Sequence, residues 1–445
     1  MRRKRWLWPA LLLCSASAAQ PAADSLLRDA AAAVQPDELH ATIEKLVGFG
    51  TRHTLSDTTS DTRGIGAARR WVQSRFAAIG RDCGGCLQIA TPAQTVSGAR
   101  IPQPTEVMNV LAIQRGTSEA NRVVMITGHL DSRVTDIMNS TSDAPGANDD
   151  GSGVAAVLEA ARALSKYKLR ATVVYGVLSG EEQGLYGGKI LADYAKAQGW
   201  QVEADLNNDI IGNSRGGDGV HDNATVRVFS EGTKASETPE QARRRRYNGG
   251  EVDSPSRNLA RMMAALAERH LTNLRIEMVY RTDRYGRGGD QVQLLEASYP
   301  AVRVTEAHED YTRQHQDTRV ENGIHYGDTL DGVDFAYLAQ VTRLNVVTLA
   351  ALANAPASPK GVTIGGAVTP HTTVRWQPVA GAAGYRVWWR RTTDAQWRHS
   401  RDVAADAREL RLPNTVIDDW FFGVSALSAD GFASPVVFPG DAGSF

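Results

Sequence analysis

Two adjacent glutamates close the segment Leu178-Ser179-Gly180-Glu181-Glu182, directly after an apolar run at 172–178. The run predicts a buried strand, and in open α/β sheets ligands bind just past the carboxyl ends of strands. A carboxylate at such a place can bind a metal ion, and its neighbour can move a proton during hydrolysis. We therefore expect Glu181 and Glu182 to mark the active site.

A histidine and an aspartate follow a second predicted strand. The apolar run at 123–126 leads into Thr127-Gly128-His129-Leu130-Asp131. A histidine that binds a metal commonly has a carboxylate nearby, which fixes its tautomer and raises its basicity. This spacing favours His129 as a ligand that Asp131 orients. Taken alone, His129 could equally be a structural histidine.

A glycine-rich turn, Pro145-Gly146-Ala147-Asn148-Asp149-Asp150-Gly151-Ser152-Gly153, precedes a predicted helix. Asp149 or Asp150 could place a carboxylate at the edge of the sheet, or could simply cap the helix. The glycines favour close approach of the backbone. A dinucleotide-binding loop is not expected, because the Gly-x-Gly-x-x-Gly spacing is absent.

Two further residues complete the set of candidate ligands. Asp209 lies within or at the end of another predicted strand, where a buried carboxylate is costly unless a cation or a hydrogen-bond network compensates it. A second nitrogen donor must come from the following half of the domain if two zinc ions are bound. We choose His315, because Gln314-His315-Gln316-Asp317 repeats the His-x-Asp arrangement of His129. The histidines that spacing leaves as competitors are His308 and His325.

Taken in this order, the five patterns resemble the secreted, dinuclear zinc aminopeptidase family, whose fold is shared by glutamate carboxypeptidase and glutaminyl cyclase relatives. The likeness covers about residues 37–353. It implies two zinc ions per chain, which lower the pKa of a bridging water and polarise the scissile carbonyl. By the resemblance, His129 and Asp209 hold one zinc, Glu182 and His315 hold the other, Asp149 bridges them, Glu181 is the general base, and Asp131 is the partner of His129.

The chain departs from the family pattern at one position. In several relatives a tyrosine immediately before the last histidine helps to stabilise the developing oxyanion, whereas this chain has Gln314 there. Tyr311 is close enough in sequence to be considered for that role. The side-chain amide of Gln314 can also donate a hydrogen bond.

The resemblance implies a secreted exopeptidase that removes the amino-terminal residue of peptide substrates. A carboxypeptidase of the same fold is the nearest alternative. It would need a basic pocket for a free carboxylate, to which Arg281, Arg284 or Arg287 could contribute. A binding protein without catalysis is an alternative from another class, but the retention of all five candidate ligands argues against it.

The elements that must position these residues alternate along the chain. Strands are expected at 107–114, 122–127, 172–178, 204–211, 275–279 and 301–305, and helices at 153–165, 186–198, 259–270 and 335–353. The alternation predicts an α/β domain over residues 20–354, with a mostly parallel central sheet flanked by helices. The polar stretch at 213–258, which contains an arginine run at 243–246, is expected to be a surface insertion.

Residues 355–445 are expected to form a second, small all-β sandwich after a proline-containing linker at 355–359. With Trp376 and Tyr385 in early strands and Trp420-x-Phe422-x-Val424-x-Ala426 in a later one, this region resembles a fibronectin type III module. Trp420 stands where that family often has a tyrosine. Such a module could attach the protein to a surface or to carbohydrate, or could serve as a passive spacer or packing module.

The composition is that of a two-domain soluble protein, because 445 residues exceed the usual size of one hydrophobic core. A formal net charge of -1 gives no reason to expect nucleic acid as the main partner. Residues 1–19 have the basic start, short apolar run and small residues of a cleaved signal peptide, which predicts export to the periplasm or the outside. A lipid anchor at Cys14 is the minor alternative.

No later segment is expected to have enough uninterrupted apolar length to cross a membrane. Two cysteines, Cys83 and Cys86, remain after removal of the signal peptide. In an exported chain they are expected to form a local disulfide. The alternative is a thioredoxin-like redox centre, which would give the pair a specific chemical function.

Overall fold

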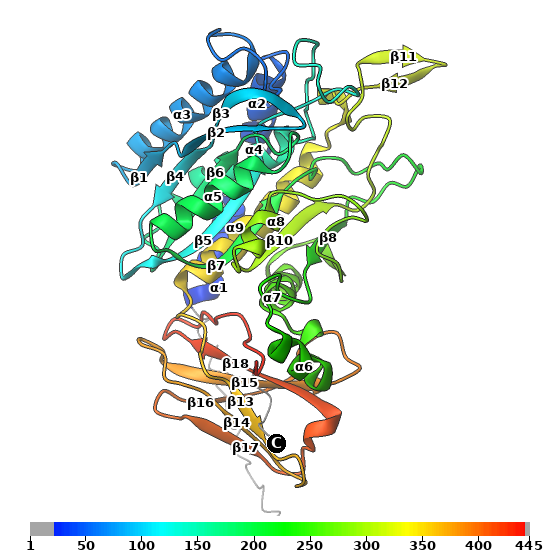
Figure 1. The fold of residues 1–445 in the computed structure, drawn as a ribbon. Helices are drawn as coiled ribbons and strands as arrows, with labels where there is room; N and C mark the ends of the chain where they lie inside the picture. Colours follow the sequence, from blue (N-terminus) through cyan, green and yellow to red (C-terminus); the bar gives the residue numbers. More distant parts are fainter. Residues whose placement is uncertain (1–21, 441–445) are drawn as a thin grey trace, which may run out of the picture.

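The computed structural model describes residues 22–440. The expected signal peptide at 1–19 and Cys14 lie outside these residues. Figure 1 shows a larger α/β part and, below it, a smaller β-domain formed by the C-terminal part of the chain. The strands of the smaller part all come after the linker expected at 355–359.

The structure assigns the following bounds. The helices are α1 (Ala22–Ala32), α2 (Pro36–Val47), α3 (Gly64–Asp82), α4 (Gly151–Leu164), α5 (Tyr186–Ala197), α6 (Pro239–Asn248), α7 (Pro255–His270), α8 (Gln291–Glu296) and α9 (Phe335–Asn354). The strands of the α/β domain are β1 (Leu87–Ala90), β2 (Ala93–Gly98), β3 (Ile101–Met108), β4 (Val110–Gln114), β5 (Glu119–His129), β6 (Ala171–Leu178), β7 (Gln201–Asn208), β8 (Thr225–Ser230), β9 (Arg275–Val279), β10 (Ala301–Glu306), β11 (Arg319–Glu321) and β12 (Ile324–Tyr326).

Eight strands form the central sheet, in the order β1-β4-β6-β5-β7-β10-β8-β9. The four strands β6, β5, β7 and β10 are adjacent and parallel to one another. Their carboxyl ends therefore lie at one edge of the sheet. The predicted fold class, a mostly parallel sheet flanked by helices with a small all-β part, is confirmed.

Alternate residues of the central strands serve two different cores. Val124 and Ile126 of β5 face the larger core with α2, α4, α7 and α9. Val123 and Met125 of the same strand face a smaller core with α5 and α8. Because successive side chains of a strand point to opposite faces, a continuous apolar strand such as β5 must be covered on both sides.

Two sequence-based expectations about elements are wrong. The stretch at 213–258 is not simply a surface insertion, because β8 (Thr225–Ser230) lies inside the central sheet, paired antiparallel with β10 and parallel with β9. The arginine run belongs to the solvent-exposed helix α6, whose N-terminus has a capping box at Thr238. The strand expected at 107–114 is divided between β3 and β4, and the helix α1 was not expected.

Helix α9 (Phe335–Asn354) runs through the α/β domain (Figure 1). Within residues 22–440 it is the one helix long and apolar enough to cross a membrane, and most of it is buried inside the protein. Its apolar composition follows from this position in the larger core.

The C-terminal β-domain consists of two three-stranded antiparallel sheets. Its strands are β13 (Thr363–Gly365), β14 (Thr372–Arg375), β15 (Gly384–Arg391), β16 (His399–Ala404), β17 (Glu409–Leu412) and β18 (Trp420–Leu427), in the orders β13-β14-β17 and β16-β15-β18. Trp376 and Tyr385 are buried in the core between the sheets. The Tyr385 hydroxyl accepts a hydrogen bond of 2.8 Å from the backbone N–H of Val379.

Buried polar contacts join the two domains. The carboxylate of Asp253 lies between Arg261 of α7 and Arg390 of β15, at N–O distances of 2.9 and 2.7 Å. The Trp397 indole donates to the side chain of Asn258 at 3.1 Å. An unpaired charge buried here would be costly, so this bridge favours one fixed arrangement of the domains.

Cys83 and Cys86 form a disulfide just after α3, with a Cα–Cα distance of 5.6 Å. The bridge closes the turn between α3 and β1. The disulfide thus constrains a local connection at the edge of the central sheet.

Candidate metal centre

The candidate ligands gather at the carboxyl edge of the parallel strands. His129 is the last residue of β5, Glu181 and Glu182 follow β6, and Asp209 comes directly after β7. His315 lies in the loop after β10. Since β6, β5, β7 and β10 are neighbours, four separate chain segments place their polar residues at one location. Asp209, which was expected within or at the end of a strand, stands just beyond it.

Asp149 lies between the two histidines. Its Oδ1 is 3.2 Å from Nε2 of His129, and its Oδ2 is 2.9 Å from Nε2 of His315. The two oxygens of one carboxylate therefore face two different imidazole rings. This is the geometry needed for a carboxylate that bridges two cations.

The side chains form two groups that could each hold a metal ion. In one group, ligand atoms of His129, Glu181 and Asp209 all lie within 4.8 Å of one another; in the other, those of Asp149, Glu182 and His315 do. Histidine nitrogens with carboxylate oxygens are a donor set that suits zinc. Oε1 of Glu182 is buried 3.0 Å from Nε2 of His315 without accepting a hydrogen bond, as expected of an atom reserved for a cation. The residues thus fit two zinc ions.

The neighbouring aspartates of the glycine-rich turn have separate tasks. Asp149 faces the histidines, whereas Asp150 caps α4 by accepting a hydrogen bond of 2.9 Å from the N–H of Gly153. The other oxygen of Asp150 accepts from the N–H of His129 at 2.9 Å. The helix cap is therefore Asp150, and Asp149 is left facing the histidines, where the predicted metal ligand would lie.

Asp131 positions the two glutamates. Its carboxylate accepts hydrogen bonds from the backbone N–H groups of Gly180, Glu181 and Glu182, at 2.9, 3.3 and 3.1 Å. The Nδ1 of His129 lies 3.0 Å from the main-chain oxygen of Asp131 and 3.7 Å from its carboxylate. The expected orientation of His129 by Asp131 therefore comes through the main chain, and the carboxylate holds the glutamate loop instead.

The burial of Asp209 is compensated by an arginine that sequence reasoning missed. Arg303 of β10 is fully buried and forms a salt bridge with Asp209. Burial lowers the pKa of Arg303, but the charges of Asp209 and Asp283 outweigh burial and raise it. An arginine inside the apolar run Ala301-Val302-Arg303-Val304 is the sequence signal that could have found it.

Charge interactions shift the ionisation of the central groups in the metal-free protein. Burial lowers the pKa of His129, but the hydrogen bond with Asp149 and the charge of Glu181 raise it well above its usual value. Burial and the charge of Glu182 raise the pKa of Glu181 well above its usual value. Burial lowers the pKa of His315, but the charges of Glu182 and Asp149 raise it to about 10. In the metal-free protein, the protonated imidazoles thus supply the positive charge that bound metal ions would supply.

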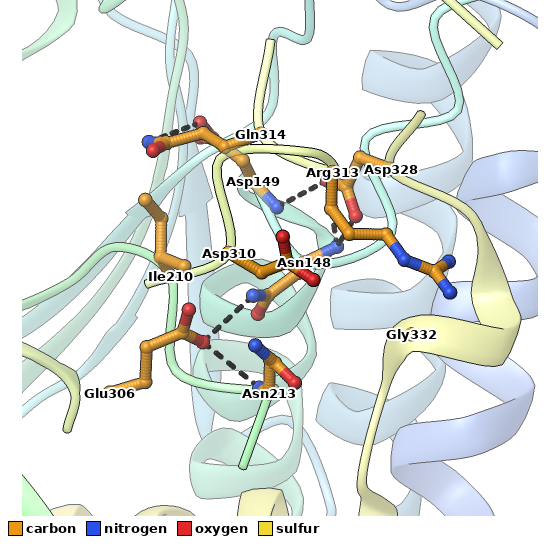
Figure 2. Close-up of a pocket in the computed structure, with 10 residues that line it drawn as sticks. All are labelled: Asn148, Asp149, Ile210, Asn213, Glu306, Asp310, Arg313, Gln314, Asp328 and Gly332. Atoms are coloured by element: carbon orange, nitrogen blue, oxygen red, sulfur yellow. Dashed lines mark hydrogen bonds between the residues drawn. The ribbon is translucent and has the colours of Figure 1, made fainter. Parts of the chain in front are cut away.

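A small cavity behind Asp149 contains a second layer of polar contacts (Figure 2). Asp328 accepts hydrogen bonds from the backbone N–H groups of Asn148 and Asp149, the latter at 2.7 Å. The Asn148 side chain donates to Glu306 at 2.8 Å, and that of Gln314 donates to Asp149 at 3.1 Å. These bonds fix the turn that presents Asp149.

Two residues at the site have positive φ angles. Ile210, next to Asp209, has a φ of 62°, and His315 has a φ of 56°. The left-handed region is unfavourable for side chains with a Cβ, most of all for β-branched ones. Ile210 is held there because its carbonyl accepts hydrogen bonds from the N–H of Glu306 and the hydroxyl of Thr305. These conformations help to set the direction of His315 and of the chain next to Asp209.

A cleft of about 620 Å³ opens over the ligands. Besides the ligands and Glu181, its lining includes four arginines, Arg100, Arg133, Arg284 and Arg287. Tyr311 also lines the cleft and is 63% exposed. Gln314 lines it as well, but its amide already donates to Asp149.

The competing histidines lie elsewhere. His308 is paired with Asp218 at 2.8 Å, and His325 is exposed on the β11–β12 hairpin, which projects from the domain (Figure 1). Of the arginines considered for a carboxylate pocket, Arg281 stacks on Tyr285, while Arg284 and Arg287 line the cleft and contact Glu309.

A mostly parallel α/β sheet with histidines and carboxylates grouped at its carboxyl edge is typical of metal-dependent hydrolases. Residues 109–319 match the model of peptidase family M28. A "Probable zinc metalloprotease" of Pyrenophora teres f. teres is 43% identical over 422 residues, covering 94% of this chain and 87% of that protein. One from Leptosphaeria maculans is 42% identical, covering 94% of this chain and 98% of that protein. The chain belongs to peptidase family M28 and is a zinc-dependent hydrolase.

Solved structures agree with the fold. LapA of Legionella pneumophila superimposes with a TM-score of 0.55 at 19% identity, covering 74% of this chain and 76% of that chain. An aminopeptidase from an Aneurinibacillus strain gives a TM-score of 0.50 at 14% identity, covering 74% of this chain and 96% of that chain.

Proposed function

We propose that this protein is a two-zinc aminopeptidase that hydrolyses the amino-terminal bond of peptides. The observation that carries the proposal is the position of Asp149, whose two oxygens face His129 and His315 at 3.2 and 2.9 Å. In this assignment His129 and Asp209 hold one zinc, Glu182 and His315 hold the other, and Asp149 is shared. The family resemblance of the motifs supports the choice of an aminopeptidase.

Glu181 is assigned as the general base. It lies near His129 and Asp209, so distance alone would also allow it to be a ligand. Because Asp149 already supplies an oxygen to the His129 side, Glu181 is free to take a proton from the attacking water and to deliver it to the leaving amine. Zinc bound here would lower the pKa of a water molecule and polarise the scissile carbonyl.

The assignment of Glu181 is tested by Glu181→Gln. We expect turnover of an aminoacyl anilide to fall by about 10²- to 10⁴-fold, with the zinc content of the wild type retained. Glu240→Gln, on the exposed helix α6, is the matched control and should change neither quantity. Full activity in Glu181→Gln would contradict the proposed mechanism. Loss of zinc in this variant would show that Glu181 is a metal ligand.

A carboxypeptidase is the second candidate, because arginines line the cleft. A free-amine dipeptide, its amino-blocked form and its carboxyl-amidated form separate the two activities. The aminopeptidase should lose turnover with the amino block and keep it with the amide. The reverse pattern would identify a carboxypeptidase.

Tyr311 is proposed as the residue that stabilises the oxyanion, since it lines the cleft and the amide of Gln314 is engaged with Asp149. Tyr311→Phe should lower kcat by about 10²- to 10³-fold if the hydroxyl acts in the transition state. An unchanged kcat would remove Tyr311 from the mechanism.

Export is proposed from the pattern of residues 1–19 and is compatible with the Cys83–Cys86 disulfide. Cell fractionation with amino-terminal sequencing of the mature chain checks it. We expect a start close after residue 18 or 19 in the exported fraction. An intact chain in the cytoplasm would contradict export.

A further inference from the structure

Arg100 differs from the other arginines of the cleft because it has no acidic partner. Each of the other three is paired with a carboxylate: Arg133 with Glu182, Arg284 with Asp283 and Glu309, and Arg287 with Glu309. Within residues 22–440, Arg100 forms no ion pair, and its one hydrogen bond runs from Nη1 to the main-chain oxygen of Glu182, at 3.0 Å. Its positive charge is therefore available to a ligand in the cleft.

The turn that carries Arg100 is anchored on the α/β domain. Arg100 lies between β2 and β3, directly before Ile101, which is fully buried. Ile101 packs with Ile190 of α5 in a small apolar cluster. The guanidinium is held by the main chain of Glu182, whose carboxylate belongs to one of the two candidate ligand groups. Arg100 is thus fixed beside the metal centre, with further N–H groups that can donate to a ligand.

The rest of the cleft offers little contact to an apolar side chain. Among the described residues that line it, Leu185 is the one aliphatic side chain, and Tyr311 is the one aromatic ring besides the histidines. Sites for apolar groups are lined mainly by hydrophobic and aromatic side chains, because binding there is driven by burial of apolar surface. An apolar side chain of the substrate would therefore gain little in this cleft, whereas a carboxylate would meet an arginine.

We propose that Arg100 is a substrate-binding residue whose guanidinium binds a carboxylate of the peptide substrate, so that the enzyme favours substrates that carry this group. Arginine matches a carboxylate with paired N–H donors, and such charge-assisted hydrogen bonds are stronger than neutral ones. The carboxylate comes from an acidic side chain or from the free carboxyl end of a short peptide, which present the same chemistry. The proposal rests on the proposed function, because it names the class of substrate for that site.

Two matched pairs of ligands separate the two sources of the carboxylate. L-glutamate and L-glutamine differ only in the charged group of the side chain. Reduced glycylglycine, in which a CH₂ group replaces the carbonyl of the peptide bond, and its carboxyl-terminal amide differ only at the carboxyl end. None of the four contains an amino-terminal peptide bond. Their affinities are measured by calorimetry on the zinc-replete protein, with the zinc content determined for each variant.

In the wild type, the ligand with the recognised carboxylate should bind about tenfold more tightly than its amide partner. Arg100→Gln should abolish this preference and leave the affinity for the amide unchanged. Arg100→Lys should keep part of the preference, because the charge stays but the paired donors are lost. A preference within the first pair assigns Arg100 to an acidic side chain, and a preference within the second assigns it to the carboxyl end of the peptide.

Arg287→Gln is the matched control for the net charge of the cleft. It removes the same charge from the same cleft, but Arg287 is already paired with Glu309 at 2.8 Å. We therefore expect Arg287→Gln to keep most of the wild-type preference. Direct binding by Arg100 predicts that the preference is lost only in Arg100→Gln, whereas a general effect of charge would weaken it equally in both variants.

The proposal is overturned if Arg100→Gln keeps the wild-type preference, if Arg287→Gln loses it equally, or if the wild type shows no preference or no binding in both pairs. These binding results do not depend on turnover. A preference that Arg100→Gln abolishes, in a protein that hydrolyses no peptide, would reject only the proposed function. Peptide hydrolysis without the preference would reject only the role of Arg100.

Discussion

Single residues of the site have roles that their neighbours in sequence do not predict. Asp149 and Asp150 are adjacent and chemically identical, yet one faces two imidazoles and the other caps α4. Glu181 and Glu182 are similarly adjacent but fall into different ligand groups. Sequence motifs could identify these pairs. Dividing the roles within them needed either the family resemblance or the geometry.

The ionisation of His129 predicts a pH dependence of zinc binding. Nδ1 lies 3.0 Å from the main-chain oxygen of Asp131 and Nε2 lies 3.2 Å from Asp149, so both ring nitrogens face oxygens that favour the protonated form. Burial opposes this, but the pKa remains raised well above its usual value. Zinc needs the neutral ring, so binding should release a proton and the apparent affinity should rise with pH from neutrality toward that raised pKa.

Calorimetric titration with zinc in two buffers of different ionisation enthalpy measures this proton release. The raised pKa of His129 also determines how the stability of the metal-free protein changes with pH. Since the folded pKa of His129 is raised, its contribution is complete below about pH 6.5 and is lost as the pH rises through the folded pKa. Zinc binding without proton release at neutral pH would contradict the assignment.

Asp131 offers a test of the glutamate loop. Asp131→Asn replaces one oxygen by an amide group that would face the N–H donors of residues 180–182. We expect zinc affinity and kcat each to fall by about 10- to 100-fold, because the loop carries both Glu181 and Glu182. Competition with a chromophoric chelator measures the affinity. Wild-type values would show that the carboxylate does not position the loop.

At the scale of elements, the close contact of α4 with the carboxyl end of β7 places Asp149 and Asp209 in one site. Gly153, in the first turn of α4, is the point of approach, because a Cβ there would lie 2.5 Å from the main-chain oxygen of Asn208. The glycine is therefore required by packing rather than by φ. The helix start and the strand end could not come this close with a larger residue.

Gly153→Ala should consequently lower the free energy of unfolding by about 1–3 kcal/mol, despite the better helix propensity of alanine. Gly80→Ala in α3 is the matched control, since its Cβ would meet Leu87 at an ordinary 3.5 Å. That control should be neutral or slightly stabilising. Denaturant unfolding measures both, and equal effects would contradict the packing argument.

Hydrophobic periodicity predicted the strands and helices that carry the site. It did not predict the neighbouring elements and contacts that depend on tertiary structure. β5 and β6 contain long apolar runs, so their positions could be predicted, and the polar residues at their ends followed. β8 was missed because it lies within a polar stretch, and its burial depends on pairing with β10 and β9, which are distant in sequence. The positive φ of Ile210 and the pairing of Arg303 with Asp209 likewise depend on tertiary contacts.

At the scale of the whole molecule, the C-terminal domain is attached through a buried charge bridge. The match to the curated relatives covers 94% of this chain, so it extends well beyond the α/β domain. We propose that the C-terminal β-domain serves mainly to pack against the α/β domain.

Asp253→Asn tests this attachment. The change leaves Arg261 and Arg390 buried without their shared anion, so the free energy of unfolding should fall by about 3–5 kcal/mol. Asp402→Asn breaks an exposed ion pair with Arg386 inside the C-terminal domain and should cost less than about 1 kcal/mol. Thermal unfolding compares the two, and equal small effects would show that the bridge does not hold the domains together.

The central claim is that two zinc ions share Asp149. Native mass spectrometry of the zinc-replete, full-length mature protein tests it most directly, because it counts the ions bound to each chain. We predict two zinc ions per chain in the wild type, and the loss of at least one in Asp149→Ala. A wild type that binds a single zinc or none, or an Asp149→Ala variant that keeps two, would contradict the account.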